Sequence, residues 1–167
     1  LRLYNRTLRR GRKPRKHQAE SLEDEDRKRY LRASKECDYR SDSFQTWKSA
    51  NKFQRGRRQG EVEFALAVFR SIAKQYSYLY VPKQDRTASA LCQTNQTDCG
   101  GLSTLFVTTM RSEGIPARLL SGRWAESAVE GESVDGQRYF KYHVIAEFYA
   151  QGVGWIPVDL SSSILHD

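Results

Sequence analysis

Hydrophobic residues in the second half of the chain change their spacing at one point, and this change constrains the fold more than any other feature. In 61–76 and 99–113 the apolar residues recur every three to four positions, as on the buried face of an α-helix. Gly114 and Pro116 then interrupt the pattern, and 117–124 and 138–150 are rich in β-forming residues. Helices followed by an antiparallel meander predict an α+β fold.

The expected elements form three regions: a basic tail or linker (1–18), a helical lead-in (19–60) and a core (61–167). In the lead-in we expect helices within 19–36 and 38–54 and a basic loop at 55–60. In the core we expect a helix over 61–80, a polar loop over 83–97, a helix over 99–113, and strands at 117–124, 138–150 and 155–161. The first core helix should bury one stripe, namely Val62, Ala65, Leu66, Phe69, Ile72, Ala73 and Tyr76.

The excess positive charge lies in the N-terminal tail. The 167 residues carry a formal net charge of +8, from 28 Lys and Arg against 20 Asp and Glu. Eight of the basic residues and none of the acidic ones lie in 1–16, so the remainder is formally neutral. Such a run could bind an anionic surface, but we interpret it as a solvated segment, because no nucleic-acid-binding signature follows it. A nucleic-acid partner is not expected, and no apolar run has the length of a membrane span.

Three cysteines, Cys37, Cys92 and Cys99, allow at most one disulfide and leave a thiol over. No C-x-x-C pair and no acidic calcium-binding loop is present, so no metal or cofactor requirement is expected. Only Cys99 opens a predicted helix, in "TDCGGLSTLF". A buried structural cysteine is the competing interpretation, because free cysteines are among the most buried residues.

The residues around Cys99 favour a reactive thiol. Asp98 has the position of an N-cap, which places Cys99 in the first turn, where the helix dipole and free N–H groups favour a thiolate. This environment can lower a cysteine pKa from about 8.5 toward roughly 3.5–7.5, although the charge of Asp98 opposes the effect. Gly100 and Gly101 are poor helix formers and indicate close approach of either a substrate or the sheet.

A thiol nucleophile needs a base, and the base needs an orienting group. His17 lies in the basic tail and His166 near the C-terminus, whereas His143 lies in a predicted core strand. Asp159 lies on the returning strand after the turn. Neighbouring strands lie about 4.8 Å apart, so His143 and Asp159 can meet if they share a face. If the helix of Cys99 packs on that face, the three side chains can come together.

The part of the chain that contains these three residues resembles a known family. Four segments from about Glu61 to Ser161 resemble the transglutaminase-like superfamily, a branch of the papain-like cysteine enzymes. "FALAVFRSIAKQYSY" resembles the helix that precedes the active-site loop, and "DCGGLSTLFVTTMRSEGIPARLLSG" resembles the nucleophile helix with its exit strand. "YHVIAEFY" resembles the histidine strand, and "GVGWIPVDLS" resembles the Gly-Trp-x-Pro-x-Asp strand. The sequence ends eight residues after Asp159, whereas members usually continue into further strands, so we expect a truncated core or a small sheet.

The resemblance implies a role for each candidate residue. Cys99 would be the nucleophile, His143 the general base and acid, and Asp159 the residue that orients the imidazole. A glutamine six residues before the cysteine helps to form the oxyanion hole in the wider group, and Gln93 stands at that spacing, with Gln96 nearby. The Cys99 N–H would be the other donor.

The resemblance also implies a papain-like core, with the nucleophile helix packed on an antiparallel sheet. Trp155 would cover the His143–Asp159 pair, or else it is an ordinary core residue. The implied reaction is acyl transfer on a protein or peptide amide, and hydrolysis is favoured because no lysine-acceptor machinery is visible. An amine-crosslinking transglutaminase and a catalytically idle binding module are the alternatives. Bacterial relatives are often exported, which favours an extracytoplasmic location over the cytoplasm.

Overall fold

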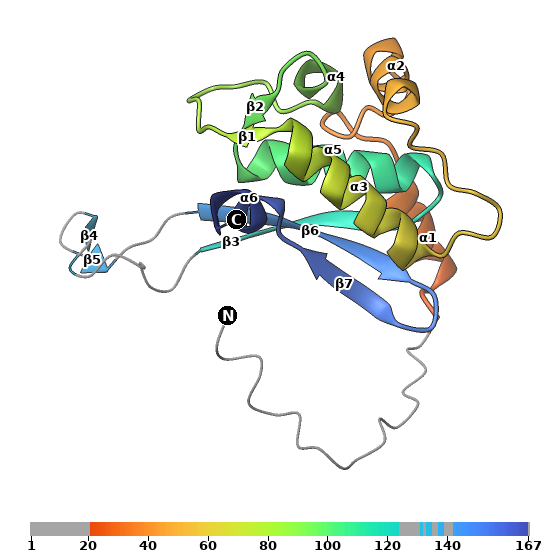
Figure 1. Cartoon of the computed structure of the whole chain (residues 1–167). Coiled ribbons are helices and arrows are strands. Elements are labelled where there is room, and N and C mark those ends of the chain that lie inside the picture. The colour runs from red at the N-terminus through yellow and green to blue at the C-terminus, as the bar shows by residue number, and fades with distance from the viewer. Residues whose placement is uncertain (1–20, 124–130, 132, 135–136, 139–141, 167) are drawn as a thin grey trace.

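The computed structural model describes residues 21–123, 131, 133–134, 137–138 and 142–166 (Figure 1). The expected basic tail, 1–18, and Trp124, the last residue of the expected strand 117–124, therefore lie outside the described residues. The helices are α1 (Asp24–Leu31), α2 (Asp42–Ala50), α3 (Glu61–Gln75), α4 (Ala88–Leu91), α5 (Cys99–Ser112) and α6 (Leu160–His166). The strands are β1 (Ser77–Tyr78), β2 (Gln96–Thr97), β3 (Ala117–Arg123), β4 (Ser133–Val134), β5 (Gln137–Arg138), β6 (Tyr142–Ala150) and β7 (Gly154–Val158).

The main sheet is an antiparallel meander with strand order β3–β6–β7, so the predicted α+β fold is confirmed. Ala117 pairs with Phe148 between β3 and β6, and Tyr149 pairs with Trp155 between β6 and β7. Two short pairs lie outside this sheet: β1 with β2, which is parallel, and β4 with β5. Within the expected strand 138–150, Arg138 belongs to β5 and Tyr142–Ala150 form β6, and these two strands have different partners.

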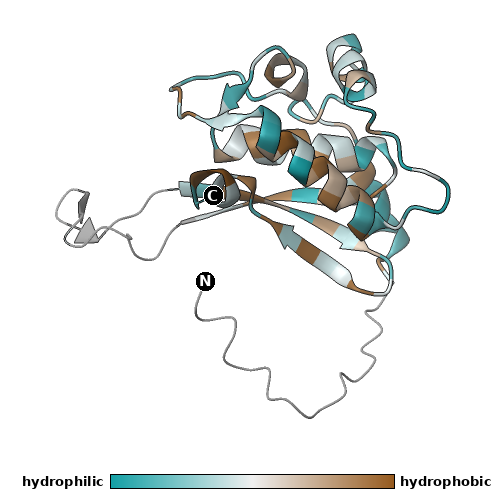
Figure 2. Cartoon of the chain, viewed as in Figure 1, coloured by the Kyte–Doolittle hydropathy of each residue, from teal (hydrophilic) through white to brown (hydrophobic). Residues whose placement is uncertain are grey.

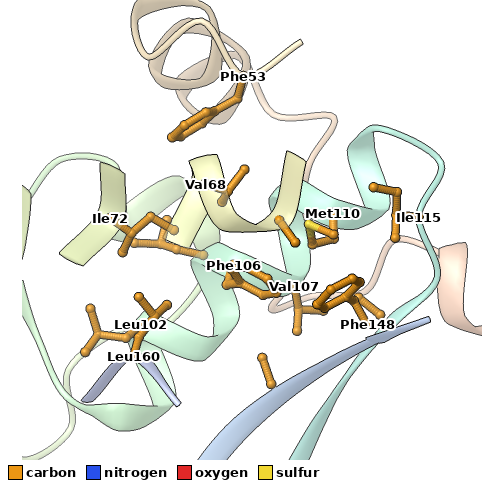
Figure 3. Close-up of a cluster of buried hydrophobic side chains, with 14 of the residues drawn as sticks. Phe53, Val68, Ile72, Leu102, Phe106, Val107, Met110, Ile115, Phe148 and Leu160 are labelled. Atoms are coloured by element: carbon orange, nitrogen blue, oxygen red, sulfur yellow. The ribbon is translucent and has the colours of Figure 1, made fainter. Parts of the chain in front are cut away.

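The core lies between α5 and the main sheet, and α3 and α6 close it. Residues 101–110 of α5 are all buried, because this helix is covered on several sides. Figure 3 shows Phe106, Val107 and Met110 of α5 close to Phe148 of β6, and the rings of Phe106 and Phe148 are 6.1 Å apart. Figure 2 shows hydrophobic residues concentrated along α5 and the strands. Cys37 and Phe53 of the lead-in belong to the same buried cluster.

The predicted stripe of α3 is confirmed only in part. Ala65, Ile72 and Tyr76 are buried as expected, whereas Val62 and Leu66 are 49% and 45% exposed, and Phe64 and Val68 are buried in their place. The helix carries apolar residues on two sides, and the side that packs on α5 is rotated from the expected one. Val62, Leu66 and Phe69 instead line an apolar hollow of about 340 Å³ between α3 and β7.

Several element ends also differ from the prediction. The helix α3 ends at Gln75, because the chain then pairs as β1 with β2. The loop predicted at 83–97 contains α4 and β2. The predicted strand 155–161 stops at Val158, because Asp159 caps α6 through a 3.0 Å hydrogen bond that the Ser162 N–H donates to its Oδ1. Gly114 has φ +74° and ends α5 as predicted.

Candidate active site

The first turn of α5 begins with a side-chain cap. Asp98 has extended backbone angles, and its Oδ1 accepts a 3.1 Å hydrogen bond from the Gly101 N–H, as expected for an N-cap. Cys99 is therefore the first residue of the helix. Its thiol lies where the free N–H groups of the helix start are concentrated.

Gly101 is required by close packing. A Cβ on Gly101 would lie 2.0 Å from Oγ1 of Thr97, a fully buried residue whose hydroxyl donates to Oε1 of Gln84 at 2.9 Å. Of the two interpretations of the glycine pair, close packing therefore explains Gly101. At Gly100 a Cβ would lie 3.3 Å from Cδ of Arg86 and from Oδ1 of Asp98, which is tight but not prohibitive.

Cys99 faces the beginning of β6. The backbone N–H groups of Val144 and Gly100 lie close enough to the Cys99 sulfur to lower the pKa of its thiol. One turn further along α5, the Ser103 hydroxyl donates a 3.1 Å hydrogen bond to the Val144 carbonyl. These contacts fix the start of α5 against Val144, which is the residue next to His143 in β6.

The pKa of Cys99 is shifted opposite to the prediction. Burial raises the pKa of the thiol, and the charges of Asp98 and Asp159 act in the same direction. The N–H groups of Val144 and Gly100 lower the pKa but do not compensate. The predicted lowering of the Cys99 pKa is therefore not found, because burial and two carboxylates outweigh the N–H groups.

His143 and Asp159 form a direct hydrogen bond. Nε2 of His143 donates to Oδ2 of Asp159 at 2.8 Å, and the two side chains are 17% and 27% exposed. A carboxylate acceptor requires the proton on Nε2, so the basic nitrogen of the neutral ring is Nδ1. The pair defines both the orientation and the tautomer of the imidazole.

Three further hydrogen bonds hold the Asp159 carboxylate. Its Oδ1 accepts from the Ser161 hydroxyl at 2.8 Å and the Ser162 N–H at 3.0 Å, and its Oδ2 accepts from the Ser162 hydroxyl at 2.7 Å. Burial alone would raise the pKa of Asp159, but the hydrogen bonds from Ser162, His143 and Ser161 hold it below its usual value. Asp159 is therefore a fixed carboxylate at neutral pH.

The site lies at the end of the sheet and not on the face that we expected. The helix α5 covers the face that carries Ala146 and Phe148, whereas alternation places His143 with the opposite set of residues. His143 is the second residue of β6, and Asp159 follows the last residue of β7. The start of β6, the end of β7 and the start of α5 thus supply the three candidate residues.

Trp155 lies away from this end of the sheet. It pairs with Tyr149, six residues along β6 from His143, which is about 20 Å at roughly 3.3 Å per residue. Its ring contacts the rings of Tyr30 and Tyr149, at 4.9 and 5.7 Å between centroids, and the Arg118 guanidinium at 4.1 Å. The expected cover over the His143–Asp159 pair was therefore wrong, because Trp155 packs with α1 and β3.

Gln93 is exposed just after α4, in a hollow whose other walls are Cys92 and residues of α2: Asp42, Ser43, Thr46, Trp47 and Ala50. Its part in an oxyanion hole stays a prediction. The alternative, Gln96, lies in β2, where its carbonyl accepts a 3.0 Å hydrogen bond from the Gln84 amide.

One residue of the site was missed by the sequence analysis. Arg86 donates from Nε to both carboxylate oxygens of Asp98, at 2.9 and 3.1 Å, and a second guanidinium nitrogen also contacts Oδ2. Arg86 precedes Asp98 by twelve residues in a polar loop, and no spacing rule connects the two.

Among the described residues, no three His, Cys, Asp or Glu side chains gather closely enough to hold a metal ion. In the same part of the chain, no helix has the length and apolar character needed to cross a bilayer.

The comparisons with known proteins point to one family. Residues 47–160 match the family model described as the transglutaminase-like superfamily. No curated protein matches the sequence.

Solved structures share the fold at low sequence identity. A candidate cysteine protease from Cytophaga hutchinsonii has a TM-score of 0.61 at 22% identity, with 83% of this chain and 43% of that chain covered. The periplasmic domain of TgpA from Pseudomonas aeruginosa has a TM-score of 0.66 at 17% identity, with 86% and 49% covered. The chain thus spans less than half the length of both, and the likeness concerns the fold.

Proposed function

Because this chain belongs to the transglutaminase-like superfamily, we propose that it is a cysteine-dependent enzyme that transfers the acyl group of a protein or peptide amide. The observation that carries the proposal is the arrangement at the end of the sheet. Nε2 of His143 is bound to Asp159 at 2.8 Å, and the N–H of Val144, the neighbour of His143, lies close enough to the Cys99 sulfur to lower its pKa. An idle binding module would not require these three side chains in this order.

The proposed mechanism begins with a neutral thiol, since burial raises the pKa of Cys99. Nδ1 of His143 accepts the thiol proton as the sulfur attacks the amide carbonyl. Asp159, which accepts from Nε2, stabilises the imidazolium that forms. The negative oxygen of the tetrahedral intermediate would be bound by backbone N–H groups at the start of α5, including that of Cys99. Each such donor contributes roughly 2.7–4 kcal/mol in other enzymes.

Collapse of this intermediate breaks the C–N bond. His143 gives its proton to the departing amine, and a thioester remains on Cys99. Water, deprotonated by His143, then attacks the thioester and releases a carboxylic acid and the free thiol. A primary amine in place of water would give a new amide, the crosslinking reaction. We favour hydrolysis, because the sequence shows no lysine-acceptor machinery.

The surface beside the site suits a peptide with apolar side chains. Leu79, Tyr80 and Val81 are 43%, 63% and 39% exposed. The Leu79 N–H donates a 3.0 Å hydrogen bond to the Thr97 carbonyl, which holds this segment against the residues that lead into Cys99. We propose that the segment contacts apolar side chains near the scissile amide. TgpA's periplasmic domain shares the fold, which supports an extracytoplasmic bacterial location, and cell fractionation would test it.

The experiment compares wild type, Cys99→Ala and the control Cys92→Ala on unstructured peptides, with and without a primary amine such as glycine methyl ester. Mass spectrometry identifies the products. Fragments that gain one water and require Cys99 support hydrolysis, whereas amine adducts that require Cys99 support crosslinking. If wild type and Cys99→Ala give the same products in both mixtures, the enzyme proposal is wrong and the idle binding module becomes the better interpretation.

A further inference from the structure

We propose that Arg86 is a positioning residue of this site, which holds Asp98 as the cap of α5 and cancels its negative charge beside Cys99. The importance of this for catalysis rests on the proposed function, but the effect is measurable on the thiol itself.

The geometry is that of a fixed ion pair. Nε of Arg86 donates to both oxygens of Asp98 at 2.9 and 3.1 Å, and its NH2 nitrogen also contacts Oδ2. NH1 donates to the Gln84 carbonyl at 3.0 Å, which fixes the plane of the guanidinium. A planar group with several donors holds a carboxylate at two points, whereas lysine offers a single charge.

The carboxylate needs such a partner, because it is nearly inaccessible to solvent. The Asp98 side chain is 6% exposed, and one of its oxygens also accepts from the Gly101 N–H at 3.1 Å. An unpaired charge at this depth would destabilise the cap. It would also repel a thiolate on the next residue, since the charge of Asp98 raises the pKa of Cys99.

Arg86 packs directly on the first turn of α5. A Cβ on Gly100 would lie 3.3 Å from the Arg86 Cδ, so the absence of a side chain there lets the arginine approach. A charged Cys99 in turn raises the pKa of Arg86, which places the guanidinium within electrostatic reach of the sulfur. This contact favours packing over substrate approach as the reason for Gly100, although the arginine could shift to admit a methyl group.

Charged and titratable groups face Cys99 from several elements. Asp98 precedes it, Arg86 comes from the loop before α4, His143 from β6 and Asp159 from the start of α6. Tyr80 lies near Arg86. Two carboxylates thus oppose the thiolate, and Arg86 offsets the nearer one.

The test follows alkylation of Cys99 by iodoacetamide against pH in the full chain, with peptide mass spectrometry as readout. Arg86→Gln should slow alkylation at neutral pH by about tenfold. This corresponds to an upward shift of about one unit in the pH midpoint of Cys99 alkylation. Arg86→Lys should retain most of the rate. The double variant Arg86→Gln/Asp98→Asn should regain much of it, because both charges are absent. Arg118→Gln is the control, since Arg118 pairs with Glu147 at 2.7 Å and contacts Trp155 instead of α5.

A purely structural cap predicts a different pattern. Arg86→Gln and Asp98→Asn would then lower Tm while the midpoint for Cys99 stayed in place, and this result would overturn the proposal. If Arg86→Gln does not fold, Asp98→Asn decides, since it must shift the midpoint downward. If Arg86→Gln slows alkylation of Cys99 but the chain gives no Cys99-dependent peptide products, the proposed function is refuted and the role of Arg86 stands.

Discussion

Asp159 holds His143 while it also caps the helix that follows. Its Oδ2 accepts from His143 Nε2 at 2.8 Å, and its Oδ1 accepts from the Ser162 N–H at 3.0 Å. One carboxylate therefore fixes the start of α6 and the orientation of the imidazole together. A change at residue 159 should consequently affect both stability and activity.

Asp159→Asn should reduce kcat on a peptide amide less than Cys99→Ala does. An amide side chain can still hold the ring, but it stabilises the imidazolium poorly and can select the wrong tautomer. A comparable substitution in another enzyme costs about 10⁴-fold in kcat. Steady-state kinetics of the two variants test this expectation. Equal activity of wild type and Asp159→Asn would remove Asp159 from the mechanism.

Asp159 should also make stability depend on acid pH. Its pKa is lower in the folded chain than the unfolded value of about 3.9, so its contribution is complete above that value and is lost as pH falls through the folded pKa. The difference in unfolding free energy between wild type and Asp159→Asn should therefore shrink below pH about 4. Urea unfolding across pH measures it, with Glu25→Gln, which changes an exposed carboxylate, as control. A difference independent of pH would contradict the assignment.

Cys99 should react with iodoacetamide before the other two cysteines, and its rate should increase as the pH rises above neutral. Burial raises the pKa of Cys92 to about 12, and Cys37 is 2% exposed. Cys99 is half-buried, and its pKa is also raised. Timed labelling with peptide mass spectrometry gives the order, and His143→Ala should slow Cys99 alone. Equal rates at all three cysteines would count against a special environment for Cys99.

Gly101→Ala should destabilise the chain by about 1–3 kcal/mol through overpacking. The new Cβ would lie 2.0 Å from Thr97 Oγ1, and this residue is fully buried. Gly100→Ala is the matched comparison and should cost less, because its nearest neighbours include the flexible Arg86 side chain at 3.3 Å. Denaturant unfolding of both variants provides the values. Equal losses would mean that helix propensity alone explains the two glycines.

Tyr80→Ser should raise KM for peptides with apolar side chains, with less effect on kcat. Tyr80 is 63% exposed in the segment held beside Thr97. Val153→Ser is the control, because Val153 is 62% exposed in the β6–β7 turn. The same KM change in both variants would show that the segment at 79–81 has no particular role.

The sequence predicted elements whose signals are local. The helix α5 begins after its cap, Asp98, and ends at Gly114, which has φ +74°. Both residue types signal a helix end in the sequence itself. The order of the main strands follows from the changed period and the glycine turn. The buried face of α3 was predicted only in part, because Val62 and Leu66 satisfy helical spacing as well as Phe64 and Val68 do.

The candidate site, too, was predicted in part. Cys99, His143 and Asp159 stand out by residue type and position, and their roles stay proposals. The pKa of Cys99 depends on burial and on carboxylates from two elements, and these are properties of the assembled fold. The Arg86–Asp98 pair spans twelve residues without periodicity, so only the three-dimensional arrangement identifies it.

Pro157 has a consequence for how the sheet meets other chains. β7 is an outer strand of the β3–β6–β7 sheet, and Pro157 lies opposite Glu147. Proline has no N–H, so it fits where that group would point away from the neighbouring strand. A foreign strand laid along β7 would find no donor at this position. The edge is thereby partly protected against edge-to-edge association between unrelated molecules.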